Sequence, residues 1–483
     1  MFKRFEGYHP DIDEAAPGMI VDGENIIPSP AGYRSAYAPV NSTSPALTAT
    51  AVDAATLIDL AGTPMVYAGT ATQLYKEDGS SWSAVSRVGD YTACTSWDFA
   101  QYGNSTYATN DVAIIQKSTG ADFADLSGSP VAKIIAVAQN QIMVFNTNEG
   151  TFGDSPNRWW CSALGNPDDW SPSISTQAAS GQLVDTPGAI VAGLNLGERM
   201  VAYKENSMYL GSYVGPPSIW AWPLITDQIG CVGKNAVINV KNAHFFMGPD
   251  DFYVFSGTYP QGIGGTFREY FFQHEVNKDF LFKTIAAYDQ VNGLVYFFYV
   301  SADSSAGIDR HVVYHIATQK WSPPTNLDIQ TATQYTKSSL TYNTLGDAYA
   351  TYDDLPSIPH NSLFWVATND SIGIINTSNR LQTLSEPASS MSVTTWSIGS
   401  EEGYSFFDRV RPRFQKYPTS GTLVNSYQED LGGAWVSSTD TITLNNGKFD
   451  FERESRFHKV RMNFVGDTEI TGIDTSIKGA GSE

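Results

Sequence analysis

The stretch Thr63–Trp82, TPMVYAGTATQLYKEDGSSW, has the pattern of short strands separated by tight turns. Met65–Tyr67 is β-branched and aromatic, which suits a half-buried pleated surface. Gly69 is expected to break this run, and alternation resumes at Gln73–Lys76. Asp78-Gly79 is a typical hairpin-turn dipeptide, and the tryptophan after it is expected to anchor the packing. The stretch therefore predicts antiparallel strands joined by hairpins.

The same pattern restarts along the chain at intervals of roughly 40 to 55 residues. The repeating stretches are 51–88, 91–126, 131–172, 186–224, 229–276, 284–324 and the looser 328–377. Repeats of this length with about four strands each are typical of a β-propeller, whereas a sandwich has no unit that restarts. We predict an all-β protein containing a β-propeller of six or seven blades.

Changes in sequence texture divide the chain into three parts. Residues 1–45 are rich in turns and carry little periodicity, which predicts an N-terminal extended arm. The repeats occupy 46–385, the predicted propeller. A Ser/Thr/Pro-rich linker then leads into 386–483, which we interpret as a C-terminal β-sandwich-like domain. The arm has no hydrophobic pattern of its own, so we expect it to pack on another surface, and an adjacent subunit is one hypothesis.

The composition limits the classes of partner. Only 16% of the residues are charged, and the formal net charge is −21. An acidic surface argues against wrapping nucleic acid, because phosphate binding requires Lys and Arg to displace counterions. The longest apolar run, Leu294–Val300, is too short to span a bilayer, and the N-terminus carries no apolar signal-peptide core. We expect a protein made in a cytoplasm with no membrane partner.

No catalytic, cofactor-binding or metal site is predicted. The chain has no nucleophile elbow, P-loop, zinc-ligand pair or dinucleotide fingerprint. His311 and His315 are four apart on a predicted strand, about 13 Å, which is too far to bind one metal. The three cysteines are 67 and 70 residues apart and are expected to be buried. Acidic pairs such as Asp168-Asp169 lie next to turn residues, where they are expected to cap the turns.

The C-terminal region is nearly balanced in charge, with 10 Lys and Arg against 13 Asp and Glu over 401–483. Its basic residues fall in two clusters, and the first has a spacing of two that places its members on one face of a strand. They are either solvated strand faces paired with nearby acids, such as Asp408 and Glu452, or a protein-contact face. The residues are Arg409, Arg411 and Arg413, then Arg453, Arg456, Lys459 and Arg461.

Six segments taken in order resemble one family, the tail hub or nozzle proteins of short-tailed bacteriophages, also called packaged-DNA stabilisation proteins. The segments are IIPSPAGYRS (26–35), YAGTATQLYK (67–76), DFAQYGNSTYATN (98–110), RWWCSALGNPDDWSP (158–172), MVAYKENSMYLGSYVGPP (200–217) and ESRFHKVRMNFVGDTEITGID (454–474). The resemblance covers nearly the whole chain and is weakest over 328–380. It transfers no catalytic residues.

The resemblance implies a structural protein of the virion tail. Such proteins form a ring, here expected to be a homohexamer, below the portal and its head–tail adaptor ring. They attach tail fibres, spikes or a tip plug. Genome DNA passes through the lumen without sequence-specific binding, and an acidic wall is consistent with a lumen that does not hold DNA.

Two alternatives remain open from the residues. A receptor-binding or lectin-like propeller needs an aromatic-lined pocket for a glycan, for which the candidates are Trp159, Trp160, Trp170, Trp220 and Trp222. A glycan-cleaving propeller enzyme needs a cluster of carboxylates with raised pKa in the central funnel.

Overall fold

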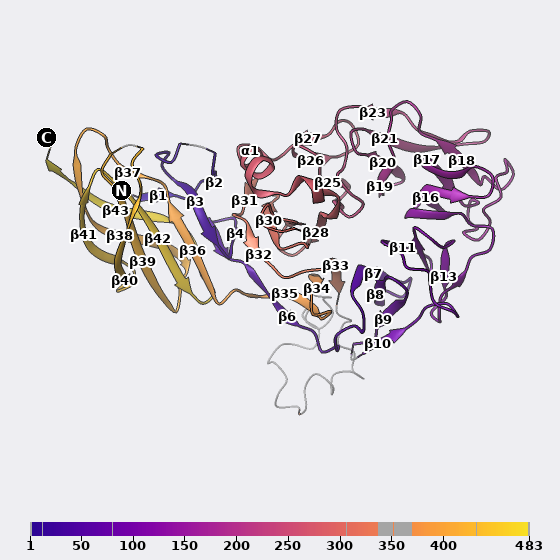
Figure 1. Cartoon of the computed structure of the whole chain (residues 1–483), viewed down its shortest axis with the longest axis horizontal. Coiled ribbons are helices and arrows are strands. Elements are labelled where there is room, and N and C mark those ends of the chain that lie inside the picture. The colour runs from indigo at the N-terminus through magenta and orange to yellow at the C-terminus, as the bar shows by residue number, and fades with distance from the viewer. Residues whose placement is uncertain are drawn as a thin grey trace.

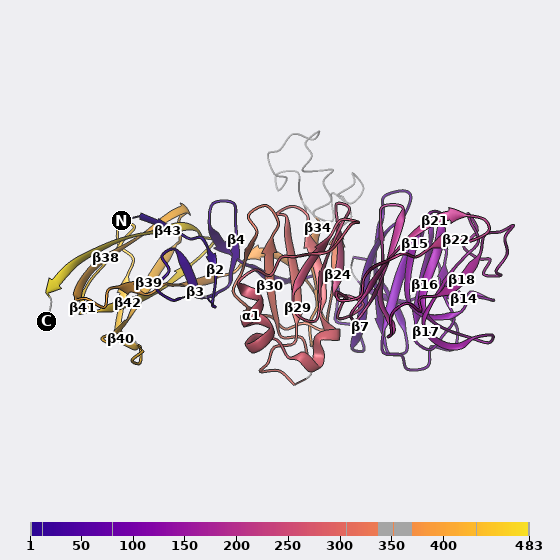
Figure 2. The same cartoon turned by 90° about the horizontal axis from the view of Figure 1, so that it is seen from above.

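The structure is a computed structural model that describes residues 2–11, 13–79, 81–305, 307–336, 351, 370–430 and 432–481. The described chain consists almost entirely of strands and turns. It forms two bodies that lie end to end, a β-propeller and a β-sandwich (Figure 1). In the view from above, the axes of the propeller strands are roughly aligned, and the sandwich continues beyond them (Figure 2). The predicted all-β fold, with a propeller and a sandwich-like domain, is confirmed.

Within the described residues the propeller has seven blades, each an antiparallel sheet whose first strand is innermost. The innermost strands contact one another around the ring. Blade 1 consists of β7 (Ala51–Ile58), β8 (Pro64–Thr70), β9 (Leu74–Glu77) and β10 (Trp82–Ala84), and blade 2 of β11 (Trp97–Tyr102), β12 (Ser105–Asn110), β13 (Gln116–Ser118) and β14 (Ala124–Asp125). Blade 3 consists of β15 (Val131–Ala138), β16 (Gln141–Glu149), β17 (Gly153–Cys161) and β18 (Ala179–Gln182). Blade 4 consists of β19 (Ile190–Leu196), β20 (Arg199–Lys204), β21 (Met208–Gly215), β22 (Ile219–Ala221) and β23 (Leu224–Thr226).

The last blade closes the ring with a strand from the other end of the chain. β6 (Tyr37–Asn41) pairs antiparallel with β35 and forms the outer strand of blade 7. Blade 5 consists of β24 (Val237–Val240), β25 (Ala243–Met247), β26 (Phe252–Phe255) and β27 (Gln261–Gly262). Blade 6 consists of β28 (Ile285–Asp289), β29 (Leu294–Tyr299), β30 (Arg310–His315), β31 (Lys320–Trp321) and β32 (Thr325–Asn326). Blade 7 consists of β33 (Thr331–Thr336), β34 (Asp370–Ile375), β35 (Leu381–Pro387) and β6. Much of the predicted looser stretch 328–377 lies outside the described residues.

The hairpin turns fall where the sequence predicts them. Gly103 and Asn140 adopt positive φ angles of 60° and 54° between the first two strands of their blades. The Asp78 carboxylate accepts a hydrogen bond from the Ser81 N–H at 2.7 Å. Gly69, however, does not break its strand, because it lies inside β8. A Cβ on Gly69 would stand 2.2 Å from the Trp97 ring, so the glycine is needed for the packing of blade 2 on blade 1.

The sandwich is built from both ends of the chain. Its first sheet has the order β4 (Ile26–Pro28), β5 (Tyr33–Ser35), β43 (Glu469–Gly481), β38 (Tyr404–Lys416) and β41 (Phe449–Ser455), with β1 (Phe2–Arg4) also on β43. Its second sheet has the order β2 (Gly7–Tyr8), β3 (Met19–Glu24), β36 (Ser390–Thr395), β42 (Phe457–Val465), β39 (Ser420–Gln428) and β40 (Val436–Thr443), with β37 (Ile398–Gly399) also on β42.

The segment 1–45, predicted as an extended arm, is therefore divided between the two bodies of its own chain. β1 to β5 lie within both sandwich sheets, and β6 belongs to the propeller. The segment lacks a hydrophobic pattern of its own because its strands are only two to six residues long, and β1, β3, β5 and β6 pair with strands from the far end of the chain.

One hydrophobic core runs from blades 4, 5 and 6 into the sandwich. At the junction, the Tyr8 ring lies 5.7 Å from that of Phe267 in the short helix α1 (Phe267–Tyr270). A π-helical turn, η1 (Phe271–Glu275), and a 3-10 helix, η2 (Lys278–Lys283), follow it. The Tyr33 hydroxyl donates to the Trp321 carbonyl oxygen at 3.0 Å. Apolar and hydrogen-bonded contacts therefore both cross the junction between the two bodies.

Candidate functional site

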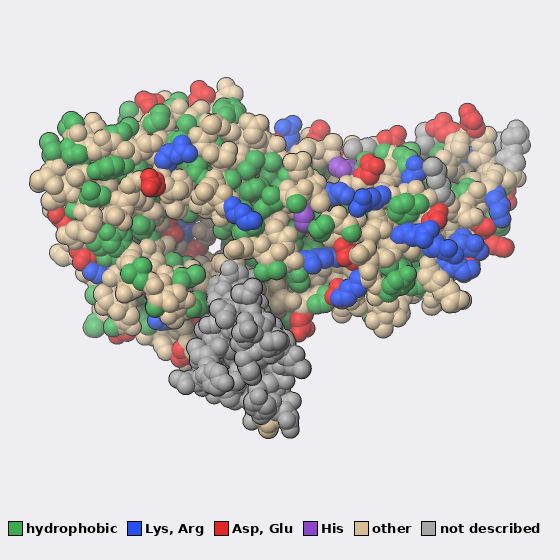
Figure 3. All heavy atoms as spheres, turned by 180° about the vertical axis from the view of Figure 1, so that it is seen from behind, with side chains coloured by type: hydrophobic (Ala, Val, Ile, Leu, Met, Phe, Trp, Pro, Cys, Tyr) green, Lys and Arg blue, Asp and Glu red, His purple; other side chains and the backbone are tan. Residues whose placement is uncertain are grey.

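The first basic cluster lies on the outer face of the first sandwich sheet. Arg409, Arg411 and Arg413 are exposed on β38 and alternate with the buried Val410 and Pro412. The structure confirms the prediction that these three arginines, called the triad below, share one face of the strand. Lys and Arg side chains gather over the sandwich, with Asp and Glu among them, whereas the propeller carries few on the same side (Figure 3).

Most of this basic charge is neutralised within the chain. Arg409 pairs with Asp450 at 2.7 Å and Arg413 with Asp474 at 3.1 Å. For Arg411 no hydrogen bond or ion pair is found among the described residues. Exposed pairs of this kind contribute little to stability. Arg411 is therefore the member of the triad with a free charge.

The second cluster lies elsewhere and binds the N-terminal segment. Lys459 pairs with Glu14, and Arg461 pairs with Glu24 at 2.9 Å. Both acids come from the first 24 residues, more than 430 positions away in sequence. The seven predicted basic residues therefore do not share one face, because Lys459 and Arg461 of the second cluster form ion pairs within the sandwich itself.

The other two members of the second cluster contact aromatic rings. The Arg453 guanidinium lies 4.8 Å from the centre of the Tyr427 ring, and that of Arg456 lies 5.3 Å from the Tyr404 ring. Such cation–π contacts add modestly to packing at a surface.

The tryptophans considered for a glycan platform are blade core. Trp159, Trp160, Trp170 and Trp220 are each exposed by 7% or less. Trp159 and Trp220 lie in the core between blades 3 and 4, against which Trp222 packs, whereas Trp160 and Trp170 lie in the core between blades 2 and 3. A sugar platform requires an exposed ring face. These five residues therefore do not form the aromatic-lined pocket that a lectin-like propeller needs.

Sequence reasoning missed a polar clamp across the propeller channel. Lys234, in the loop before blade 5, reaches the Asp53 carboxylate of blade 1 at 3.0 Å and also donates to the Trp97 carbonyl oxygen of blade 2. Asn235 donates to the other Asp53 oxygen at 2.6 Å. Blades 1 and 5 are separated by two blades on the shorter side of the ring, so this contact reaches across the channel.

Two carboxylates of the innermost strands also join neighbouring blades. Asp53 accepts the Trp97 N–H at 2.8 Å, and Asp98 of blade 2 accepts the Ile135 N–H of blade 3 at 2.9 Å. Burial raises the pKa of Asp98 from 3.8 to about 6, against the opposing effects of Lys234 and of the Ile135 hydrogen bond. An Asp near the start of the first strand in two successive repeats was the sequence signal for these contacts.

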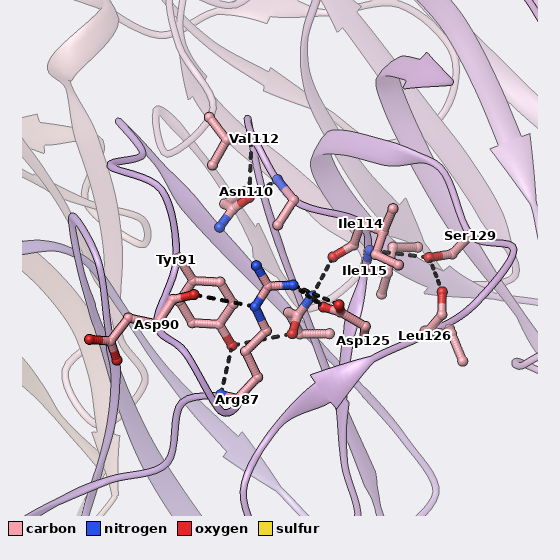
Figure 4. A network of polar contacts seen from close by, with 12 residues as sticks. Arg87, Asp90, Tyr91, Asn110, Val112, Ile114, Ile115, Asp125, Leu126 and Ser129 are labelled. Carbon is pink, nitrogen blue, oxygen red and sulfur yellow. Dashed lines mark hydrogen bonds and ion pairs between the residues drawn. The ribbon is translucent and has the colours of Figure 1, made fainter. Parts of the chain in front are cut away.

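A comparable network joins blades 1 and 2 further out (Figure 4). Arg87 pairs with Asp125 at 2.5 Å, and the buried Gln116 side-chain amide donates to the same carboxylate at 2.7 Å. The Tyr91 hydroxyl donates to Gln116 at 3.3 Å. These polar groups are used in packing blades against each other.

Within the residues that the structure describes, no group of three or more His, Cys, Asp or Glu could hold a metal ion. In the same part of the chain, no helix is both long and apolar enough to cross a membrane. Cys94, Cys161 and Cys231 are buried free thiols, as predicted.

Comparison with known proteins identifies no family, since neither a family model nor a curated protein matches the chain. Solved structures are similar in part. YCF48 bound to D1 peptide is 12% identical over 74% of this chain and 97% of its own, with a TM-score of 0.39. The extracellular domain of the two-component system BT4673 from B. thetaiotaomicron is 12% identical over 85% of this chain and 45% of its own, with a TM-score of 0.43. The computationally designed protein Ika8 is 10% identical over 71% and 99%, with a TM-score of 0.35.

Proposed function

We propose that the chain is a structural subunit of a virion tail ring, the hub or nozzle of a short-tailed bacteriophage. The observation that carries this proposal is the continuous junction between propeller and sandwich. They share one core, and the N-terminal segment supplies strands to both. A ring of identical subunits requires each subunit to present its two contact surfaces at a fixed angle, because a flexible subunit does not close a ring of defined size.

The ring is proposed to be a homohexamer below a head–tail adaptor ring, carrying fibres, spikes or a tip plug. The exposed Arg411, with its flanking Arg409 and Arg413, is a suitable contact for a neighbouring subunit. Genome DNA would follow the axis of the ring, because the Lys234–Asp53 contact crosses the channel of the propeller itself. The proposal assigns no catalysis, in keeping with carboxylates that are engaged in joining blades.

The test is electron microscopy of the source particles with gold-labelled antibody against this chain. We expect label on a short tail below the portal, in both intact and DNA-emptied particles. An antibody against a head protein is the control for the position of the label. Label at fibre tips, or none on the particle, would contradict the tail-ring proposal.

A further inference from the structure

The propeller contains a cavity of about 610 Å³ where the connections between blades meet the innermost strands. All seven blades contribute to its lining, which includes Thr50 and Asp53 of blade 1. The clamp that Asp53 forms with Lys234 and Asn235 is part of this lining. This cavity, called the funnel below, is in the size range of ligand sites.

The wall and mouth of the funnel are largely apolar. Ile134, Val191 and Ile308 contribute to the wall. Phe282, at the end of η2, lines the same cavity and is 60% exposed. Its position depends on Gly233, where a Cβ would stand 2.4 Å from the Phe282 carbonyl oxygen. An exposed aromatic ring above an apolar wall is suited to cover an apolar group of a ligand.

The charge of the funnel differs in sign from that of the chain. Asp and Glu outnumber Lys and Arg by 50 to 29 overall, yet the lining contains Lys133, Lys234 and Lys283 against only Asp53 and Glu205. Lys234 is neutralised by Asp53. Lys133 is exposed on the innermost strand of blade 3 and, among the described residues, makes no hydrogen bond or ion pair.

We propose that this funnel binds a carboxylate carried on an apolar body. Lys133 pairs with the carboxylate, and Phe282 and the aliphatic wall cover the apolar part. An acidic–apolar segment of a partner protein and a free medium-chain fatty acid both have this chemistry. The inference does not depend on the tail-ring proposal, since it concerns a cavity within a single chain.

The test uses the full chain and two probes. One is a fluorescently labelled, C-terminally amidated tetrapeptide of three leucines and one glutamate, compared with the same peptide carrying glutamine in place of glutamate, and the other is octanoate. We expect saturable binding of the glutamate peptide, weaker by about tenfold for the glutamine peptide and for Lys133→Gln, because each loses one charge-assisted contact. Phe282→Ala should weaken binding several-fold, since its ring area is lost.

Lys241→Gln is the matched control, because Lys241 lies in the exposed turn between β24 and β25, away from the funnel lining. Thermal melting of every variant checks that it folds. Octanoate binding that depends on Lys133, without peptide binding, supports the site and identifies a small acid as its ligand. The proposal is overturned if neither probe binds, or if binding is unchanged in both Lys133→Gln and Phe282→Ala.

Discussion

The propeller and the sandwich are both all-β, but they are assembled from different kinds of contact. Each propeller blade is made largely of strands consecutive in sequence, joined by hairpins. The sandwich instead pairs β1 with β43 and β3 with β36, strands separated by most of the chain. Local contacts leave a periodic signature in the sequence, and long-range pairing does not. This difference explains why the sequence predicts the propeller better than the sandwich. It also predicts how each of the two bodies responds to mutation.

Deleting residues 1–36 should have the largest effect and should separate the two bodies. The deletion removes β1 to β5 from both sandwich sheets and exposes core that Phe5 and Tyr33 cover, while β6 still closes the propeller. We expect rapid proteolysis after residue 387 and a protease-resistant propeller. Mass spectrometry of the fragments measures this. A deletion variant with an intact sandwich would show that the N-terminal strands are dispensable.

Breaking the channel clamp should destabilise the propeller alone. Lys234→Met leaves the largely buried Asp53 carboxylate without its counter-charge, which should cost about 3–5 kcal/mol. Asp53→Asn combined with Lys234→Met should recover part of the loss, since no buried charge remains. Denaturant unfolding of the single and double variants measures the coupling. Equal loss in Lys234→Met and Lys241→Met would show that the ion pair contributes nothing.

Lys204 offers a test of blade packing without an ion pair. It is fully buried and donates to the carbonyl oxygens of Leu183 and Thr186 at 2.8 and 2.6 Å. Lys204→Met leaves these acceptors unpaired, so we expect a loss of about 2–3 kcal/mol. Chemical denaturation is the measurement. The control is Lys241→Met, because Lys241 lies in an exposed turn, and we expect a change within about 0.5 kcal/mol.

Asp98 should give the propeller a pH dependence of opposite sign to that of most carboxylates. Its folded pKa of about 6 lies above the ordinary 3.8, so the folded state binds the proton more tightly than the unfolded state. The stabilisation from this proton is present below pH 4 and is lost as the pH rises through 6. The free energy of unfolding of the wild type, relative to Asp98→Asn, should therefore fall by about 2 kcal/mol between pH 4 and pH 6, since each unit of pKa difference corresponds to about 1.4 kcal/mol. A flat difference would contradict the raised pKa.

Arg411→Ala, in the sandwich, should have the smallest effect on folding of the changes considered. Arg411 is exposed and has no ion pair among the described residues, so we expect a change in unfolding free energy within about 0.5 kcal/mol. If the triad is a subunit contact, the same variant should reduce ring formation, measured by mass photometry. Arg461→Ala is the comparison, because its partners lie within the chain. Equal assembly of both variants would remove the triad from the interface.

The parts that the sequence predicts are those fixed by local geometry. The repeats, the turns at Gly103 and Asn140 and the common face of the β38 arginines all follow from spacing and turn chemistry. The role of Gly69 was missed because it depends on Trp97, a residue of the next blade. The clamp between Asp53 and Lys234 was missed for a related reason, since 181 positions separate the two residues.

The outer strand of blade 7 has a consequence for synthesis of the chain. The Gln382 side chain of β35 donates a hydrogen bond to the Asn41 side chain of β6, which lies 341 positions earlier in the chain. At typical elongation rates of 5–20 residues per second, β6 emerges roughly 20–70 s before its partner strand exists. During that time its edge is unpaired on the ribosome, as is that of β1, whose partner is β43. A nascent chain on a neighbouring ribosome then offers the same pairing partner, so polysome density should govern how often two copies exchange their first strands.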